Sequence, residues 1–364
     1  MRTAIVVGAG IGGVTAAVAL EQCGWQVTVL ERAPELGEVG AGISVWPAAL
    51  AVLDELGVEG VARAARLGSG AGMRRADGRW VVDASALGVE LPVMIHRAEL
   101  HRLISERLGS AVTIHTGTTV SGLTQDADGV TVLAGDTQYR AELVVAADGI
   151  RSVVRGLLYP QYKGARYSGY TAYRGIAEVE TLDDGGETWG RGQRFGFAKL
   201  VDGRYYWYAT ANRPAGSESD DVRERFAGWH DPIPALIAGS SGVLRNDIYD
   251  LTTPLVPFVQ GRVLLLGDAA HAMTPNLGRG ACSAIEDAGA LARVLRRGDE
   301  LSAYDAERRP ATTKLVKRSR QVGVVGQLDN PVLCALRDGV FGLGGKLAGL
   351  SARRRRSERA PAAQ

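Results

Sequence analysis

The stretch AIVVGAGIGGVTAAVALEQCGWQVTVLE, residues 4–31, decides the fold. It begins with an apolar run that predicts a buried strand, passes through a glycine-rich turn that opens a helix, and ends in a second apolar run followed by Glu31. Strand, glycines, helix, strand and terminal acid within about thirty residues form the pattern of a dinucleotide-binding βαβ unit. We therefore expect a Rossmann-like domain with a parallel sheet.

Each glycine of this turn has a physical role. Gly8 makes the tight turn, Gly10 admits a pyrophosphate, and Gly13 lets the helix pack closely on the strand. Glu31 is placed to accept hydrogen bonds from ribose hydroxyls, and its charge disfavours a 2′-phosphate. This segment leaves NAD and FAD both open, and the alternative is that the glycines serve only a tight turn. The predicted cofactor-binding set here is Gly8, Gly10, Ile11, Gly12, Gly13 and Glu31.

Residues Thr3 to Leu20 carry no charge, which superficially resembles a signal sequence or a short membrane span. The glycines inside the run favour a buried strand and helix instead. The three cysteines show no CxxC or Cys/His spacing, so we expect reduced thiols and no metal site. A cytoplasmic protein is the resulting expectation.

Bulk composition limits the classes of protein. A chain of 364 residues is long enough for two domains, and 48 glycines without a periodic repeat point to turns and cofactor loops. A net charge of +2 gives no argument for nucleic-acid binding.

A second segment, GRVLLLGDAAHAMTPNLGRGACSAIEDAGA at 261–290, combines a strand, an acidic loop and a glycine turn that opens a helix. The strand is Val263 to Leu266, and the loop carries Asp268 and His271. Backbone N–H groups at a helix start attract anions, and glycines allow close approach of a flat ligand. We interpret the segment as an anion site. His271 is expected to be a loop residue that bonds backbone groups, and the alternative is that it tunes the site.

Between about Tyr162 and Leu255 aromatic residues accumulate and helical periodicity disappears. Short alternating runs predict a mostly antiparallel sheet, hence a second domain. An aromatic stripe on a sheet is more often core than pocket.

Further positions have a functional and an ordinary structural interpretation. The glycine loop Glu38 to Ser44 could approach a ring system or be a surface turn. Arg97 opposes the helix dipole near a helix start, where an anion could compensate it. Asp148 follows a strand at the sheet edge where α/β proteins bind ligands.

The C-terminal region is predicted to be helical and basic. Ser302 to Gln321 forms a helix that Pro310 kinks or restarts. The apolar segment Val332 to Leu350, followed by Arg353 to Arg356, could lie on an anionic membrane. Because its glycines make a poor amphipathic helix, we do not expect membrane contact, and we expect the end of the tail to be disordered.

Three ordered motifs now coincide: GAGIGG with Glu31-Arg32, ADGIRSVVR at 147–155, and GDAAH at 267–271. Over about Met1 to Gln321 the chain resembles class A flavoprotein monooxygenases of the para-hydroxybenzoate hydroxylase fold. MTPNLGRGACSAIED, GYTAYRGIA and GAGISVWP are similar to zeaxanthin epoxidases, FAD-dependent urate hydroxylases and salicylate hydroxylase-like enzymes.

The resemblance implies FAD as cofactor, with NADH or NADPH as a transient co-substrate and O2 as oxidant. It places the adenosine ribose on Glu31, the ribityl or ribose region on Asp268, and a shared FAD and nicotinamide role on Asp148. Arg279 departs from the glutamine usual in the family. Arg194 and Tyr206 match in order and spacing an Arg and a Tyr near the substrate of urate hydroxylases, and are the candidate catalytic residues. The remaining implied cofactor contacts are Arg32, Gly42, Arg97, Pro275, Gly278, Gly280 and Ala281.

The implied fold is α/β: a Rossmann-like, GR2-type FAD-binding domain with an inserted, mostly antiparallel substrate domain and C-terminal helices. We expect the discontinuous FAD domain at 1–70, 97–162 and 255–330, the substrate domain at 71–96 and 163–254, and a C-terminal helix with a basic tail at 331–364.

The implied activity is NAD(P)H-dependent hydroxylation of a small aromatic or heteroaromatic molecule through a flavin C4a-hydroperoxide. Epoxidation of an isoprenoid or other alkene, and a FAD-containing oxidase or non-oxygenating protein, are the alternatives. The chain is expected to be a monomer or homodimer without nucleic-acid partners.

Overall fold

The computed structural model describes residues 2–37, 42–63, 65–66, 72–83, 92–180, 182, 185–217 and 221–359. Part of the predicted glycine loop and the last residues of the predicted tail lie outside them. The chain divides into two compact units. Unit 1 comprises Met1–Arg63, Ile95–Ser168 and Tyr249–Val322, and unit 2 comprises Ala64–Met94, Gly169–Ile248 and Gly323–Gln364.

Unit 1 is built on a six-stranded sheet in the order β18-β19-β12-β1-β2-β8. Neighbours from β19 to β8 are parallel and β18 is antiparallel, as in a doubly wound Rossmann-like sheet. The strands are β1 (Thr3–Val7), β2 (Gln26–Leu30), β8 (Val112–His115), β12 (Leu143–Ala146), β18 (Val259–Gln260) and β19 (Val263–Leu265). A separate antiparallel sheet joins β9 (Gly122–Gln125), β10 (Val130–Ala134) and β11 (Thr137–Ala141).

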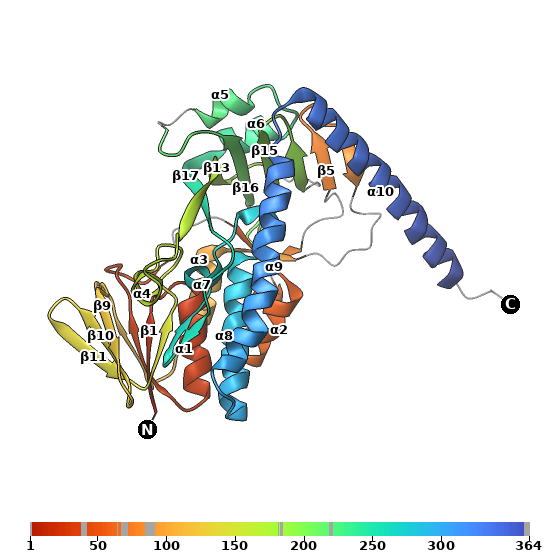
Figure 1. Ribbon diagram of the computed structural model, residues 1–364. Helices are drawn as coiled ribbons and strands as arrows, with labels where there is room; N and C mark the ends of the chain where they lie inside the picture. Colours follow the sequence, from red (N-terminus) through yellow and green to blue (C-terminus); the bar gives the residue numbers. More distant parts are fainter. Residues whose placement is uncertain are drawn as a thin grey trace. The chain divides into compact units, whose positions relative to one another are not determined.

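Helix α1 (Ile11–Gln22) is apolar on nearly all sides because it is packed on nearly all sides. It contacts α8 (Gly280–Arg297) and α3 (Arg97–Ser105), and α8 in turn contacts α2 (Pro47–Glu55). Figure 1 shows α1, α8 and α2 side by side. The uncharged N-terminal run is therefore a strand and a helix, as predicted.

The glycine turn sits where the backbones meet. A Cβ on Gly13 would overlap the carbonyl oxygen of Gly8, and a Cβ on Gly8, whose φ is +97°, would lie 2.5 Å from the Ala147 carbonyl oxygen. A Cβ on Gly12 would lie 2.9 Å from Leu266 and 3.0 Å from Ala284. The first glycine motif therefore packs directly against the strand and helix of the segment at 261–290.

Two local predictions need correction. Asp268–His271 is a short helix, α7, rather than a loop. Helix α9 (Ser302–Gly326) runs through Pro310, so the alternative in which the proline starts a new helix is wrong. Buried Arg308 and Thr312 flank the proline, so tertiary packing on both sides outweighs its one missing backbone hydrogen bond. The other segments of unit 1 are β3 (Gly42–Val45), η1 (Val61–Arg63), α4 (Val153–Leu158) and η3 (Pro275–Leu277).

Unit 2 contains a mostly antiparallel seven-stranded sheet in the order β17-β13-β16-β15-β14-β5-β6, with one parallel pair, β14 and β5. The first residues of β13 and the last residues of β17 belong to unit 1. The strands are β5 (Gly72–Arg75), β6 (Trp80–Asp83), β13 (Ala165–Ala177), β14 (Gly186–Trp189), β15 (Gln193–Lys199), β16 (Tyr205–Asn212) and β17 (Ser240–Leu251). The other elements are β4 (Ala65–Arg66), β7 (Val93–His96), α5 (Val222–Phe226), α6 (Ile233–Ala238) and α10 (Pro331–Arg359).

The two faces of this sheet differ, because side chains alternate along a strand. Odd-numbered residues of β15 and β16, such as Phe195 and Trp207, form a buried core with α5 and α6. Their rings stack with centroids 5.3 Å apart. Even-numbered residues, including Arg194 and Tyr206, therefore lie on the opposite face. The predicted aromatic sheet is real, and much of its aromatic content is core.

Candidate functional site

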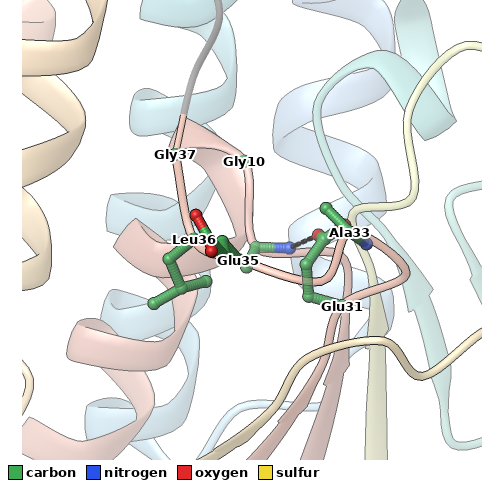
Figure 2. A pocket seen from close by; sticks show the side chains of 7 residues that line it. Gly10, Glu31, Ala33, Glu35, Leu36 and Gly37 are labelled. Atoms are coloured by element: carbon green, nitrogen blue, oxygen red, sulfur yellow. Dashed lines mark hydrogen bonds between the residues drawn. The ribbon is translucent and has the colours of Figure 1, made fainter.

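A pocket of about 170 Å³ lies where β2 ends beside the glycine turn. Figure 2 shows Glu31 together with Glu35, Leu36 and Gly37 from the loop that follows, lining the pocket with Gly10. One Glu31 carboxylate oxygen accepts a hydrogen bond from the Ala9 N–H at 2.7 Å, and the other accepts from the Ala33 N–H at 2.8 Å. Each oxygen keeps a further lone pair for an incoming hydroxyl.

Helix α3 supports the same turn. The His101 Nε2 atom lies 2.7 Å from the carbonyl oxygen of Ala9 and is buried. Arg97 is the first residue of α3 and is half-buried, whereas Arg32 is exposed directly after β2. Both predicted cofactor contacts belong to unit 1.

The motif at 147–155 is tied to the motif at 267–271 by one buried side chain. The Arg155 guanidinium donates to the carbonyl oxygens of Ile150 at 2.6 Å and Ala269 at 2.7 Å. Asp148 accepts from the Val154 N–H at 3.1 Å, and its other oxygen is buried with no hydrogen-bond partner among the described residues. Burial raises the pKa of the Asp148 carboxyl above its usual value. An unsatisfied buried acceptor of this kind suits a ligand that donates a hydrogen bond.

The turn before α8 is open to a flat ligand. Pro275 begins η3, Gly278 has a φ of +60°, and Gly280 begins α8 with no atom within 4 Å of an added Cβ. A Cβ on Gly278 would lie 3.4 Å from the Ser44 hydroxyl and 3.8 Å from the Trp46 Nε1 atom. Partly buried Ala281 follows Gly280, Gly42 begins the strand that carries Ser44, and Asp268 is exposed at the start of α7.

A chain of alternating charges begins at this turn. The Arg279 guanidinium donates to Glu286 at 2.6 Å and lies 5.7 Å from the Trp46 ring. Arg308 joins Glu286 at 3.3 Å to Asp287 at 2.6 Å. Asp287 continues the chain to the buried His271 and also accepts from the Gly267 N–H at 3.0 Å. The predicted role of His271 is thus wrong in its partner, which is a carboxylate and not a backbone group.

The carboxylate of Asp287 is fully buried. Burial acts to raise the pKa of Asp287, but attraction to His271 and Arg308 outweighs it and lowers that pKa below its usual value. One side chain thereby joins α7, α8 and α9 beneath the glycine turns.

The candidate catalytic residues lie in unit 2. Arg194 is 2% exposed and its Nε atom donates to Glu187 at 2.7 Å, while its guanidinium lies 4.8 Å from the Trp189 ring. Tyr206 is 8% exposed on the next strand. Burial acts to lower the pKa of Arg194, and attraction to Glu187 outweighs it, so the pKa is raised.

Gly196 explains how this cluster forms. Gly196 pairs with Glu187 on one side and with Tyr208 on the other. A Cβ on Gly196 would lie 2.5 Å from the Tyr208 ring, so its absence lets the phenol cross the strand to bond Glu187. Burial, and then the charge of Glu187, hold the pKa of Tyr208 well above its usual value, which keeps the phenol neutral.

The partners of these residues are not evident in the sequence. Glu187, Trp189 and Tyr208 adjoin Arg194 only through strand register, which a single sequence does not specify. Glu286 and Asp287 stand inside the quoted motif MTPNLGRGACSAIED, so an acidic pair following a glycine turn was an available signal.

A family model and several known proteins match this chain. A family model described as FAD binding domain matches residues 1–319. The chain belongs to this FAD-binding family. It is an FAD-dependent monooxygenase, and NAD(P)H is the electron donor typical of such enzymes.

Several relatives cover nearly the whole chain. Aurachin C monooxygenase/isomerase of Stigmatella aurantiaca is 40% identical over 92% of each chain. FAD-dependent urate hydroxylase of Klebsiella pneumoniae is 34% identical over 87% of this chain and 88% of its own. A variant of HpxO from Klebsiella pneumoniae, solved complexed with FAD, superposes with a TM-score of 0.85 at 30% identity, covering 97% of this chain and 98% of that one.

Several structural features of unit 1 of this monooxygenase suit FAD binding. The Gly8 to Gly13 turn leaves no room for side chains, and the pocket at Glu31 is lined with hydrogen-bond acceptors. The buried Trp46 Nε1 atom and the unpaired Asp148 oxygen are polar atoms without partners among the described residues. FAD, when bound, supplies the reductive activation of O2. The N–H groups at the start of α8 would favour negative charge on the reduced ring if FAD binds against this turn.

Replacing Glu31 tests the ribose assignment. Glu31→Ala should raise the FAD dissociation constant about 10- to 100-fold, because charge-assisted hydrogen bonds contribute about 1.5–3 kcal/mol each. Flavin fluorescence titration of the apoprotein measures it. Glu35→Ala, which removes an exposed carboxylate of the same pocket, is the control and should change affinity little. Equal affinities for both variants would remove Glu31 from the cofactor site.

Replacing Asp287 tests the buried charge chain. Asp287→Asn should lower the free energy of unfolding by about 3–5 kcal/mol at neutral pH, because it leaves buried Arg308 with only the more distant Glu286 as a charged partner. Urea denaturation of the apoprotein gives the value. Asp126→Asn, which breaks a solvent-exposed pair with Arg140, should cost far less.

The way in which the unfolding free energy depends on pH follows from the direction in which the pKa of Asp287 is shifted. Its folded pKa is lowered, so its contribution is complete above the usual carboxyl pKa and is lost as pH falls through the folded value. The difference in unfolding free energy between the parent and Asp287→Asn should therefore shrink below about pH 4. A difference that stays constant down to pH 2 would contradict a charged Asp287.

Arg279 offers a test of the electrostatics at the turn. Arg279→Gln removes a cation and leaves Glu286 less compensated, so reduced, negatively charged FAD should be less stable. We expect a reduction potential about 30 mV more negative, equivalent to about 1.4 kcal/mol for a two-electron couple. Dye-coupled titration measures it. The matched control is Arg293→Gln, which removes a solvent-accessible ion pair between Arg293 of α8 and Glu307 of α9.

Proposed function

We propose that this monooxygenase hydroxylates an uncharged, nitrogen-containing aromatic ring, with FAD held by unit 1 and the substrate by the even-numbered face of the unit 2 sheet. The names of two relatives, aurachin C monooxygenase/isomerase and urate hydroxylase, support a heteroaromatic substrate class. The observation that carries the proposal is the ion pair between Arg194 and Glu187.

The ion pair bears on substrate charge. A buried cation suits a substrate carboxylate only when no carboxylate of the protein already neutralises its charge. Here Glu187 already compensates the charge of Arg194, and Tyr208 is neutral. A ring with N–H and carbonyl groups suits such a site better than a benzoate does, because it offers hydrogen bonds and adds no uncompensated charge.

In this proposal Tyr206 contacts the substrate and Arg194 is a positioning residue that holds Glu187 and Trp189. Both stand on the sheet face opposite the aromatic core. Within unit 1, Glu31, Asp148, Asp268 and the turn at 275–281 hold FAD. The three cysteines are free thiols, which supports a reducing, cytoplasmic location.

The experiment is a substrate screen with the FAD-loaded enzyme. Neutral 4-quinolones should stimulate NADH or NADPH oxidation about tenfold or more over the basal rate, whereas salicylate and urate, which are both anions at neutral pH, should not. With ¹⁸O2, mass spectrometry should find one labelled oxygen atom in the product. NAD(P)H oxidation without labelled product would favour an oxidase, and labelled epoxide from an alkene would favour epoxidation.

Arg194→Gln is the companion variant. We expect kcat/KM to fall about 10- to 100-fold, because Glu187 would lose its charged partner and the polar face of the sheet would no longer be held in place. FAD content should stay unchanged, because Arg194 lies in unit 2. Unchanged kcat/KM would place the substrate elsewhere.

A further inference from the structure

Helix α10 is one continuous helix, drawn in blue in Figure 1, despite its glycines. The helix predicted for 331–364 is therefore present from Pro331 to Arg359. Gly342 and Gly345 face β6, where a Cβ on Gly345 would lie 3.2 Å from the Val82 side chain. Their small size lets the helix lie close to the strand.

The outward face of α10 is apolar. Leu336 and Leu343 are each 63% exposed, Val340 is 61% exposed and Val332 is 73% exposed. From Pro331 to Gly344 every exposed residue is apolar or glycine. The exposed set is Pro331, Val332, Leu333, Ala335, Leu336, Gly339, Val340, Phe341, Leu343 and Gly344.

The charges of this segment point inward. Arg337 and Asp338 are buried and bond one another at 3.0 Å. Asp338 also accepts from Arg75 at 3.0 Å, and the Arg337 guanidinium lies 5.3 Å from the Trp189 ring. A helix that faces water carries its charges outward, so this helix has the opposite arrangement. An apolar face this long calls for an apolar partner.

The sequence that follows indicates what that partner is. The sequence from Lys346 to Arg359 contains six basic residues against one acidic residue, Glu358. A second copy of the chain would bring a second cationic segment to the same interface. An anionic phospholipid surface supplies both an apolar layer and opposite charge.

We propose that α10 is a peripheral membrane anchor that places its Val332 to Leu343 face in the interface of an anionic bilayer, with Arg353 to Arg356 at the lipid headgroups. None of the helices among the described residues is long and apolar enough to cross a membrane. The anchor therefore lies along the surface. It is independent of the substrate proposed above.

The test uses the full-length, FAD-loaded protein and sedimentation with vesicles of phosphatidylcholine alone or mixed with phosphatidylglycerol. Binding to the anionic vesicles should exceed binding to the neutral ones about tenfold or more and should weaken with salt. Two variants separate the components: L336S/V340S/L343S removes the apolar face, and R353Q/R354Q/R355Q/R356Q removes the charge. Each should reduce binding about tenfold or more.

The matched control is V201S/V243S/L244S, which removes exposed apolar side chains elsewhere on unit 2 and should bind like the parent. FAD absorbance and thermal unfolding verify that each variant is folded. Equal binding to both vesicle types, or full binding by the L336S/V340S/L343S variant, would overturn the proposal. So would a dimer in solution that only this variant dissociates, because the face would then be covered by a second copy.

Discussion

The carboxylate of Asp287 is the interaction on which the arrangement of unit 1 depends. It is fully buried and bonds the Gly267 N–H, His271 and Arg308, so it fixes the turn after β19, the short helix α7 and the long helix α9 to α8. A buried charge is tolerated only when such partners compensate it, which makes its three contacts interdependent. The same chain of charges reaches Arg279 at the start of α8. The position of the turn proposed to face the flavin is thereby coupled to the core.

Unit 2 carries polar side chains on a sheet that is rich in aromatic residues. Alternation of side chains sends Phe195 and Trp207 to the core and Arg194 and Tyr208 to the other face. Gly196 then allows Glu187 and Tyr208 to meet across one strand. An ion pair and a neutral phenol result in place of an uncompensated cation, and this electrostatic balance underlies the proposed preference for uncharged rings.

Helix α10 differs from an ordinary surface helix, because its buried side chains include charged ones and its exposed side chains are apolar. Its charged pair, Arg337 and Asp338, is held against Trp189 and Arg75, and its glycines allow the close approach to β6. The apolar side chains have only the outward face left. A composition that suggested a poor amphipathic helix thus gives one whose apolar face is exposed.

The sequence by itself determined the βαβ unit, the three ordered motifs and hence the family, because glycine turns, apolar strands and terminal acids are local and leave their spacing in the chain. It also indicated the antiparallel sheet and named Arg194 and Tyr206, whose roles stay predictions. Only the tertiary structure decided the partners: Glu187 for Arg194 through strand register, Asp287 for His271 across 16 residues, and Arg155 for Ala269 across 114 residues. Such pairings depend on which backbone segments approach one another in three dimensions. A shift of one residue in strand register or helix packing would give each of these side chains a different partner.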